Sequence, residues 1–184
     1  MSAYRFAVTC QGRSTMRGIK SMLAIVAGFG ISLGEISVGE AAVAQPAAGL
    51  VGTWLPVSAV HTRPDGTKVE LFGPDPTGIL IFQSDGHFSF ILNRPDLPKF
   101  ATHNPNAGTP EEYKAIVQGS FAYFGTYTVT NSTIVMHVDG GTWPDWYGTD
   151  HDRLIISFSG SELRWTDPTP SVGGKIENVW KRAK

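Results

Sequence analysis

The chain has 184 residues, of which 41% are hydrophobic and 17% charged, a composition typical of a globular domain. Its 15 basic and 16 acidic side chains give a formal net charge of −1. A nucleic-acid-binding domain needs a basic excess to neutralise phosphates, so this balance argues against a nucleic-acid partner. The 21 glycines and 12 prolines favour a turn-rich fold over a helical bundle.

Residues 1–44 have the pattern of an export signal. An apolar run over residues 22–33 follows several basic side chains, and Ala42, Val43 and Ala44 provide the small residues of a cleavage site. The run is well short of the ~20 apolar residues that cross a bilayer, so we expect no membrane anchor. The basic side chains before the run are Arg5, Arg13, Arg17 and Lys20.

This interpretation predicts a signal peptide over residues 1–44 and an exported domain, periplasmic or secreted, over residues 45–184. Met16 provides an alternative start that would give a signal of more ordinary length. The single cysteine, Cys10, lies within the signal. The domain is therefore expected to contain no disulfide and to depend on its hydrophobic core.

Beyond residue 49, runs of β-branched and aromatic residues alternate with short turns rich in Gly, Asp, Asn and Ser. This pattern is typical of an antiparallel all-β domain, and it predicts about eight or nine strands. The predicted strands are residues 51–60, 68–72, 78–83, 87–93, 121–130, 133–139, 153–159, 162–167 and 175–182.

Short links between the predicted strands imply that neighbours in sequence are neighbours in space. Turns such as Pro64-Asp65-Gly66 and Asn131-Ser132 supply residues that tolerate positive φ. A single sheet this wide curls and closes, which removes its edges and encloses an apolar interior. We therefore predict an up-and-down antiparallel β-barrel, with a β-sandwich as the alternative.

One short helix is predicted near residues 110–119. Thr109 is a capping residue, Pro110 occupies the first helical position, and Glu112 completes a capping box. We expect this amphipathic helix to pack over one open end of the barrel. The link before it, residues 94–108, is long enough either to carry function or simply to reach across the mouth.

Residues at both ends of the domain carry a family resemblance. Gly52 and Trp54 lie on the first predicted strand and Arg182 on the last, and together they resemble the lipocalin signature. The whole domain is similar to bacterial lipocalin-like domains, a family defined by fold more than by chemistry. The resemblance implies a barrel closed at one end by Trp54, with Arg182 stacked on its indole through a cation–π contact. The similar stretches are residues 50–54, 62–67, 78–82, 93–96, 122–127, 144–146 and 179–182.

Strand parity predicts which side chains face the interior, because alternate residues share a face. Phe88 and Phe90 belong to the apolar face of the fourth predicted strand, and Arg94 continues the same parity to the interior rim. Arg94 is therefore a candidate anchor for a ligand carboxylate. The alternative is a structural ion pair with Asp96 or Asp145.

Aromatic side chains are the other candidate ligand contacts. Tyr123 and Tyr127 have inward parity, so their hydroxyls either orient a ligand or belong to a filled core. Trp143 and Trp146 lie on one loop, where they either line the mouth or cover the barrel end.

An acid–base pair is the basis of an enzymatic alternative. His137 has the outward parity of its strand, which indicates a solvated side chain. The family resemblance implies a functional His at this position, where it could act with Tyr127. Similar domains often carry a second His where this chain has Met136, which weakens any role that needs two adjacent imidazoles.

No metal site or cofactor is expected. Asp150, His151 and Asp152 are residues of the ligand type, but neighbours on a strand point to opposite faces, and we interpret the segment as a solvated turn. The leading hypothesis is an exported protein that holds a small hydrophobic or amphipathic ligand in its barrel. The alternatives are a small isomerase or cyclase and a filled barrel with a structural or interaction role.

Overall fold

Antiparallel strands follow one another in chain order in the computed structural model, which describes residues 49–184. The expected signal peptide, residues 1–44, lies outside the described residues. The α-helix α1 (Pro110–Gly119) precedes the fifth strand, and the short 3-10 helix η1 (Pro144–Trp146) follows the sixth. The strands are β1 (Gly52–Thr62), β2 (Lys68–Glu70), β3 (Thr77–Phe82), β4 (His87–Asn93), β5 (Ser120–Thr130), β6 (Thr133–Gly141), β7 (Thr149–Phe158), β8 (Glu162–Asp167) and β9 (Lys175–Arg182).

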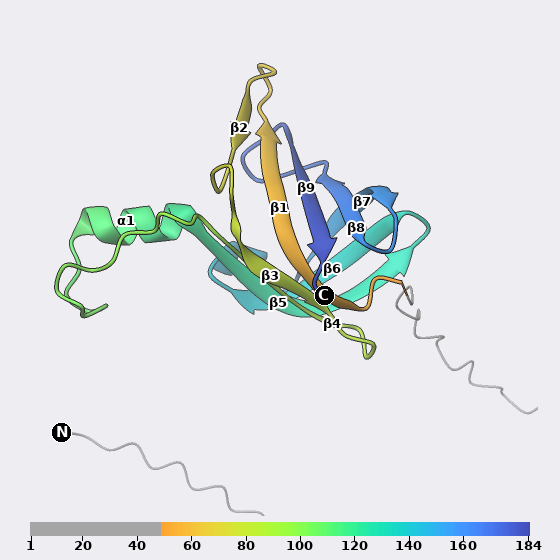
Figure 1. Ribbon diagram of the computed structural model, residues 1–184, viewed down its shortest axis with the longest axis horizontal. Helices are drawn as coiled ribbons and strands as arrows, with labels where there is room; N and C mark the ends of the chain where they lie inside the picture. Colours follow the sequence, from red (N-terminus) through yellow and green to blue (C-terminus); the bar gives the residue numbers. More distant parts are fainter. Residues whose placement is uncertain (1–48) are drawn as a thin grey trace, which may run out of the picture. The chain divides into compact units, whose positions relative to one another are not determined.

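Eight of the described strands close into a barrel, which confirms the predicted fold (Figure 1). Each strand from β3 to β9 pairs with the next, and β1 completes the ring because it pairs with both β3 and β9. The short strand β2 lies outside this ring and pairs only with the end of β1, where Val60 is opposite Glu70. The continuous ring excludes the β-sandwich alternative.

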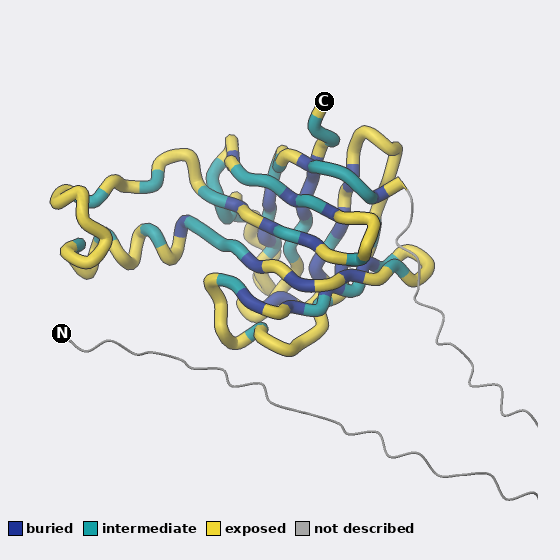
Figure 2. The backbone as a smooth tube through the Cα atoms, turned by 90° about the horizontal axis from the view of Figure 1, so that it is seen from below, coloured by how far each residue is buried: buried dark blue, intermediate teal, exposed yellow. Residues whose placement is uncertain are grey.

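Alternation along the strands places apolar side chains inside the ring. On β6, Ile134, Met136 and Val138 are fully buried, whereas the side chain of His137 between them is half-exposed. On β4, Phe88 and Phe90 face inward as predicted. Figure 2 shows the same alternation of buried and more exposed residues along other strands, with the fully exposed segments mainly in the links.

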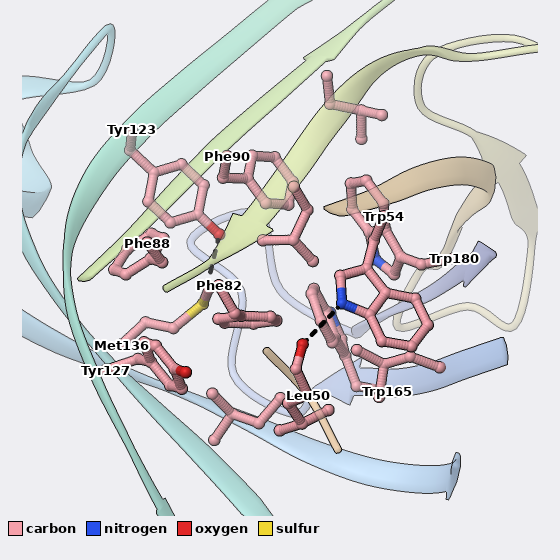
Figure 3. Close-up of a cluster of buried hydrophobic side chains, with 14 of the residues drawn as sticks. Leu50, Trp54, Phe82, Phe88, Phe90, Tyr123, Tyr127, Met136, Trp165 and Trp180 are labelled. Carbon is pink, nitrogen blue, oxygen red and sulfur yellow. Dashed lines mark hydrogen bonds between the residues drawn. The ribbon is translucent and has the colours of Figure 1, made fainter. Parts of the chain in front are cut away.

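Three tryptophan side chains pack in the buried interior of the barrel (Figure 3). Trp54, Trp165 and Trp180 are completely buried, and the Trp54 indole Nε1 donates a hydrogen bond to the carbonyl oxygen of Leu50 at 2.9 Å. The guanidinium of Arg182 lies over the Trp54 ring. The cation–π contact implied by the family resemblance is therefore present.

Gly52 makes the approach of Arg182 possible. Its φ of +137° is a conformation that L side chains rarely adopt, and a Cβ there would lie 2.5 Å from Arg182 Nη1. The same guanidinium donates hydrogen bonds to the carbonyl oxygens of Val51, at 2.9 Å, and of Gly49. Glycine is thus required at this position by both backbone conformation and space.

Helix α1 begins with the predicted capping box. The Thr109 hydroxyl accepts a hydrogen bond from the Glu112 backbone N–H at 3.2 Å, and the Glu112 carboxylate accepts one from the Thr109 N–H at 2.7 Å. Within residues 49–184, no helix has both the length and the apolar character needed to span a membrane.

The expectation that α1 packs over the open end of the barrel is wrong for most of its length. The helix and the link before it project away from the barrel as an arm (Figure 1). Phe100 of the link packs on Tyr113 of the helix, with ring centroids 5.4 Å apart, so part of the helix's apolar surface is covered within the arm itself. Only the last turn, with Val117 and Gln118, reaches the barrel mouth.

Candidate functional site

A cavity of about 290 Å³ lies at the end of the barrel opposite Trp54. It is found where β4 ends and β5 begins, and strands, the last turn of α1 and the links before β7 and β9 all contribute to its wall. The lumen is therefore filled at one end and hollow at the other. The aromatic side chains of the wall are Phe72, Phe90, Phe121, Tyr123, Trp143 and Trp146.

A buried ion pair interrupts this apolar wall. Arg153 Nη1 lies 3.1 Å from Asp167 Oδ2, and the two side chains are only 4% and 9% exposed. Arg153 also donates a hydrogen bond to the carbonyl oxygen of Asp152 at 2.9 Å, and its Nη2 is 3.5 Å from the hydroxyl of Tyr123. The cavity thus has one charged, internally neutralised region in a mainly apolar surface.

Strand parity explains why these charged side chains lie inside. Arg153 on β7 alternates with Ile155, which packs against the core. On β8, the inward face carries Leu163, Trp165 and finally Asp167. Because β7 and β8 are neighbours, the two charged residues come from adjacent strands and meet in the wall.

The environment fixes the protonation states of this region. Burial opposes the charge on Arg153, but the nearby Tyr123 and Asp167 outweigh it and raise the pKa of the guanidinium above its ordinary value. Burial also raises the pKa of the Tyr123 hydroxyl, although Arg153 acts in the opposite direction. Arg153 therefore stays charged and Tyr123 stays neutral, so the tyrosine hydroxyl can both donate and accept hydrogen bonds.

Trp146 forms one side of the cavity and is held from several directions. Its ring stacks on His151, with centroids 3.9 Å apart, and packs edge-on against Phe121 at 5.2 Å. The indole Nε1 donates a hydrogen bond to the Ser171 hydroxyl at 3.3 Å, and the Arg153 Cζ lies 5.7 Å from the ring centroid. These contacts fix the orientation of the indole before any ligand enters.

The cavity brings together four of the residues singled out from the sequence: Phe90, Tyr123, Trp143 and Trp146. Phe88 and Tyr127 are buried in the filled part of the core and do not line the cavity. The Tyr127 hydroxyl is already occupied, since it donates a hydrogen bond to the carbonyl oxygen of Gln83 at 2.9 Å.

Arg94 does not stand at the interior rim. Its guanidinium makes a two-pronged contact with Asp96, at 3.0 Å and 2.8 Å, and both side chains are about half or more exposed to solvent. The reason is that β4 ends at Asn93, so strand parity no longer applies, and the Arg94 N–H instead bonds to the Gly119 carbonyl oxygen at the end of α1. The ion pair with Asp96, one of the alternatives considered, is the observed arrangement.

His137 also lies outside the cavity. Its Nδ1 is 2.7 Å from the Asp150 carboxylate on the neighbouring strand, on the outer face of the barrel, as its outward parity predicts. Tyr127 lies inside the barrel. The two side chains are therefore on opposite sides of the barrel wall and do not form the acid–base pair suggested for an enzyme. Within the described residues, no group of three or more His, Cys, Asp or Glu side chains is placed to hold a metal ion.

Three buried polar residues of the wall were not singled out from the sequence: Arg153, Asp167 and Asn178. The sequence contains a signal for them, because each has the same strand parity as a neighbouring apolar residue: Ile155 for Arg153, Trp165 for Asp167, and Trp180 for Asn178. A charged or amide side chain in that register is costly unless it has a function or a partner.

A closed antiparallel barrel with an apolar cavity at one end is the architecture of small-molecule-binding barrels. The family model of the lipocalin-like domain matches residues 51–181, and the chain belongs to this family. The lipocalin-like barrel is a fold that typically binds small hydrophobic ligands. None of the curated proteins matches the chain.

Several solved structures are similar to this chain. A lipocalin-like protein from Bacteroides uniformis ATCC 8492 is 19% identical, with a TM-score of 0.42 over 73% of this chain and 99% of its own. An uncharacterised protein from Bacteroides eggerthii DSM 20697 is 13% identical, with a TM-score of 0.37 over 73% and 99% of the two chains. A redesigned β-barrel bound to DFHBI is 20% identical, with a TM-score of 0.36 over 73% and 95%.

Proposed function

We propose that this protein is an exported binding protein that holds one small hydrophobic or amphipathic molecule in the cavity opposite Trp54. The observation that carries the proposal is the cavity itself: about 290 Å³ of space, walled by aromatic side chains and held open by a closed barrel. Its wall is largely in place without a ligand, because Trp146 and Arg153 are already fixed by protein contacts.

The cavity volume sets the size of the ligand. At about 30 Å³ for each water-sized unit, 290 Å³ accommodates roughly ten such units, which corresponds to a compact molecule of up to three rings. Burial of roughly 300 Å² of apolar surface contributes about 7 kcal/mol before the cost of association, so apolar contacts alone support micromolar or weaker affinity. Tighter binding requires polar contacts with the wall.

The binding proposal is tested with N-phenyl-1-naphthylamine, an uncharged apolar probe whose fluorescence rises in an apolar site. We expect a saturable rise with a dissociation constant on the order of micromolar. Ser171→Trp places an indole at the cavity wall and should weaken binding at least ~10-fold by occupying the space. Ser161→Trp is the matched control, because Ser161 is an exposed turn serine outside the cavity and its replacement should leave the affinity unchanged.

Absence of a saturable rise with the unmodified protein would contradict the proposal. So would equal losses for the two tryptophan variants, because the probe would then be bound elsewhere on the surface.

Export is part of the same proposal, and the pattern of residues 1–44 supports it. The test is the intact mass of the protein recovered from the periplasm or medium after expression of the full chain. We expect a mature protein that begins at Gln45. Ala44→Arg, which removes a small residue of the cleavage site, should leave the precursor uncleaved, whereas Val43→Ile should be processed normally. Uncleaved wild-type protein found only in the cytoplasm would overturn this part of the proposal.

A further inference from the structure

Three charged or amide side chains of the barrel strands lie in the mainly apolar wall of the cavity: Arg153 on β7, Asp167 at the end of β8 and Asn178 on β9. All three are buried. Removing a polar group from water costs free energy unless the group is hydrogen-bonded. The partners that each side chain has within the protein therefore indicate which hydrogen bonds are left for a ligand to make.

Arg153 and Asp167 balance each other's charge. The carboxylate faces the guanidinium at 3.1 Å with one oxygen, and its other oxygen accepts a hydrogen bond from the Thr169 N–H at 3.2 Å. A carboxylate ligand would bring a second negative charge close to Asp167, and an ammonium ligand a second positive charge close to Arg153. Either ligand would leave a net charge in a largely apolar site, which is unfavourable.

Of these three residues, Asn178 is the one whose side-chain amide has no hydrogen-bond partner among the described residues, and it is only 7% exposed. The amide is not one of the unpaired polar groups that are sealed from solvent, so it remains reachable from the cavity that it lines. It lies on the inward face of β9 between Ile176 and Trp180, and it lines the cavity. The amide therefore presents two N–H donors and one carbonyl acceptor to the cavity, next to strand β8 with Asp167.

We propose that the ligand has an uncharged polar head that both donates and accepts hydrogen bonds, such as a carboxamide, and that this head binds Asn178 beside the Arg153–Asp167 pair. This inference rests on the proposed function, because it concerns the ligand of the same cavity. The aromatic walls, with Phe90 and Trp146 among them, favour a flat ring for the apolar part. The ligand class is thus a small aromatic compound with a neutral, amide-like head rather than a carboxylate or an amine.

The test compares compounds that share one ring system and differ only in the head. Naphthalene-2-carboxamide, naphthalene-2-carboxylate, 2-naphthylmethylammonium and 2-methylnaphthalene are each titrated against the protein with bound N-phenyl-1-naphthylamine, and displacement of the probe is measured. We expect the carboxamide to bind at least ~10-fold more tightly than the carboxylate and the ammonium, and about 10-fold more tightly than the methyl compound.

The outcomes separate this inference from the proposed function. If 2-methylnaphthalene displaces the probe but the carboxylate or the ammonium binds as tightly as the carboxamide, the neutral-head inference fails while the binding function stands. If neither the probe nor any naphthalene binds, the proposed function fails, and the inference fails with it.

Two variants locate the head. Asn178→Leu should abolish the advantage of the carboxamide over 2-methylnaphthalene and leave the methyl compound bound as before. Gln118→Leu is the matched control, because it removes an amide from the exposed rim of the same cavity and should preserve the advantage. An unchanged carboxamide preference in Asn178→Leu would overturn the assignment of the head. The ranking of the four compounds on the unmodified protein tests the inference even if this variant does not fold.

Discussion

The guanidinium of Arg182, on the last strand, lies over the indole ring of Trp54, on the first, with its Cζ 4.2 Å from the ring centroid. The same side chain donates hydrogen bonds to backbone oxygens of Val51, Gly49 and Gly160. Arg182 therefore links β9 to the start of β1, where the ring closes, through a cation–π contact and through hydrogen bonds from its planar guanidinium.

Replacement of Arg182 should destabilise the barrel more than its partly exposed position suggests. A cation–π contact contributes about 0.5–2 kcal/mol and a charged hydrogen bond about 1.5–3 kcal/mol, so we expect Arg182→Ala to lower the free energy of unfolding by about 2–4 kcal/mol. Arg182→Lys should recover only part of this stability, because lysine keeps the positive charge but lacks the planar guanidinium with its several N–H donors. Urea unfolding gives these values, and Lys181→Ala, at the exposed neighbouring residue, should change little.

Two buried tryptophans should respond differently to the same substitution. Trp54 and Trp180 are both fully buried, but only the Trp54 Nε1 has a hydrogen-bond partner, whereas the Trp180 Nε1 has none among the described residues. Replacing Trp54 by Phe removes the donor to the Leu50 carbonyl oxygen and leaves that oxygen unpaired. Replacing Trp180 by Phe only removes a buried N–H that has no acceptor. Trp54→Phe should therefore lower the free energy of unfolding by about 1–3 kcal/mol more than Trp180→Phe. Equal losses in urea unfolding would contradict this account.

The buried ion pair and the surface ion pair should differ in their contributions to stability. Removal of one partner of a buried pair costs about 3–5 kcal/mol because the other charge is left uncompensated, whereas an exposed pair contributes about 0–1 kcal/mol. We expect Arg153→Met to destabilise strongly and the double variant Arg153→Met/Asp167→Leu to cost much less than the sum of its single variants. Arg94→Ala, which breaks the exposed pair with Asp96, is the control and should change neither stability nor probe binding appreciably.

An additive double variant would show that Arg153 and Asp167 do not stabilise each other. Weaker probe binding in Arg94→Ala would return that residue to the list of ligand contacts.

His151, behind Trp146, should make stability depend on pH. Burial, assisted by the positive charge of Arg153, lowers the pKa of His151 below 6.5. As the pH falls, His151 is therefore protonated in the unfolded chain before it is protonated in the folded protein. The stability that neutral His151 contributes is complete above pH 6.5 and is lost as the pH falls through the lowered pKa. We expect His151→Phe, which keeps an aromatic ring against Trp146, to lose less stability between pH ~7.5 and ~5 than wild type. Parallel stability curves for the two proteins would contradict this.

The barrel could be predicted from the sequence because each strand repeats the same alternation. Met136 and Val138, on either side of His137, illustrate this: the apolar residues are buried and the histidine faces outward. The capping box at Thr109 and Glu112 likewise located the start of α1, since it is a purely local signal. The direction in which α1 projects depends instead on contacts within the arm, and no local pattern encodes it.

The cavity was predictable only in part. Phe90 and Tyr123 follow from parity, because they lie well inside regular strands. Arg94 was misplaced because parity was extended one residue past the end of β4, where the chain leaves the sheet. Arg153 was missed because the predicted strand began at that residue, four positions after the true start of β7, which placed Arg153 at a strand end instead of well inside the sheet.

The pairing of β1 with β9 places the two ends of the described domain side by side, since Trp54 is opposite Arg182. A short peptide could therefore connect residue 184 to residue 49, and new termini could be opened at the exposed turn around Asp85. Such a circularly permuted chain would keep every strand pair of the ring and would differ only in which turn is open. It would also move the new termini to a site chosen by the experimenter, which makes the barrel a practical scaffold for attaching reporters.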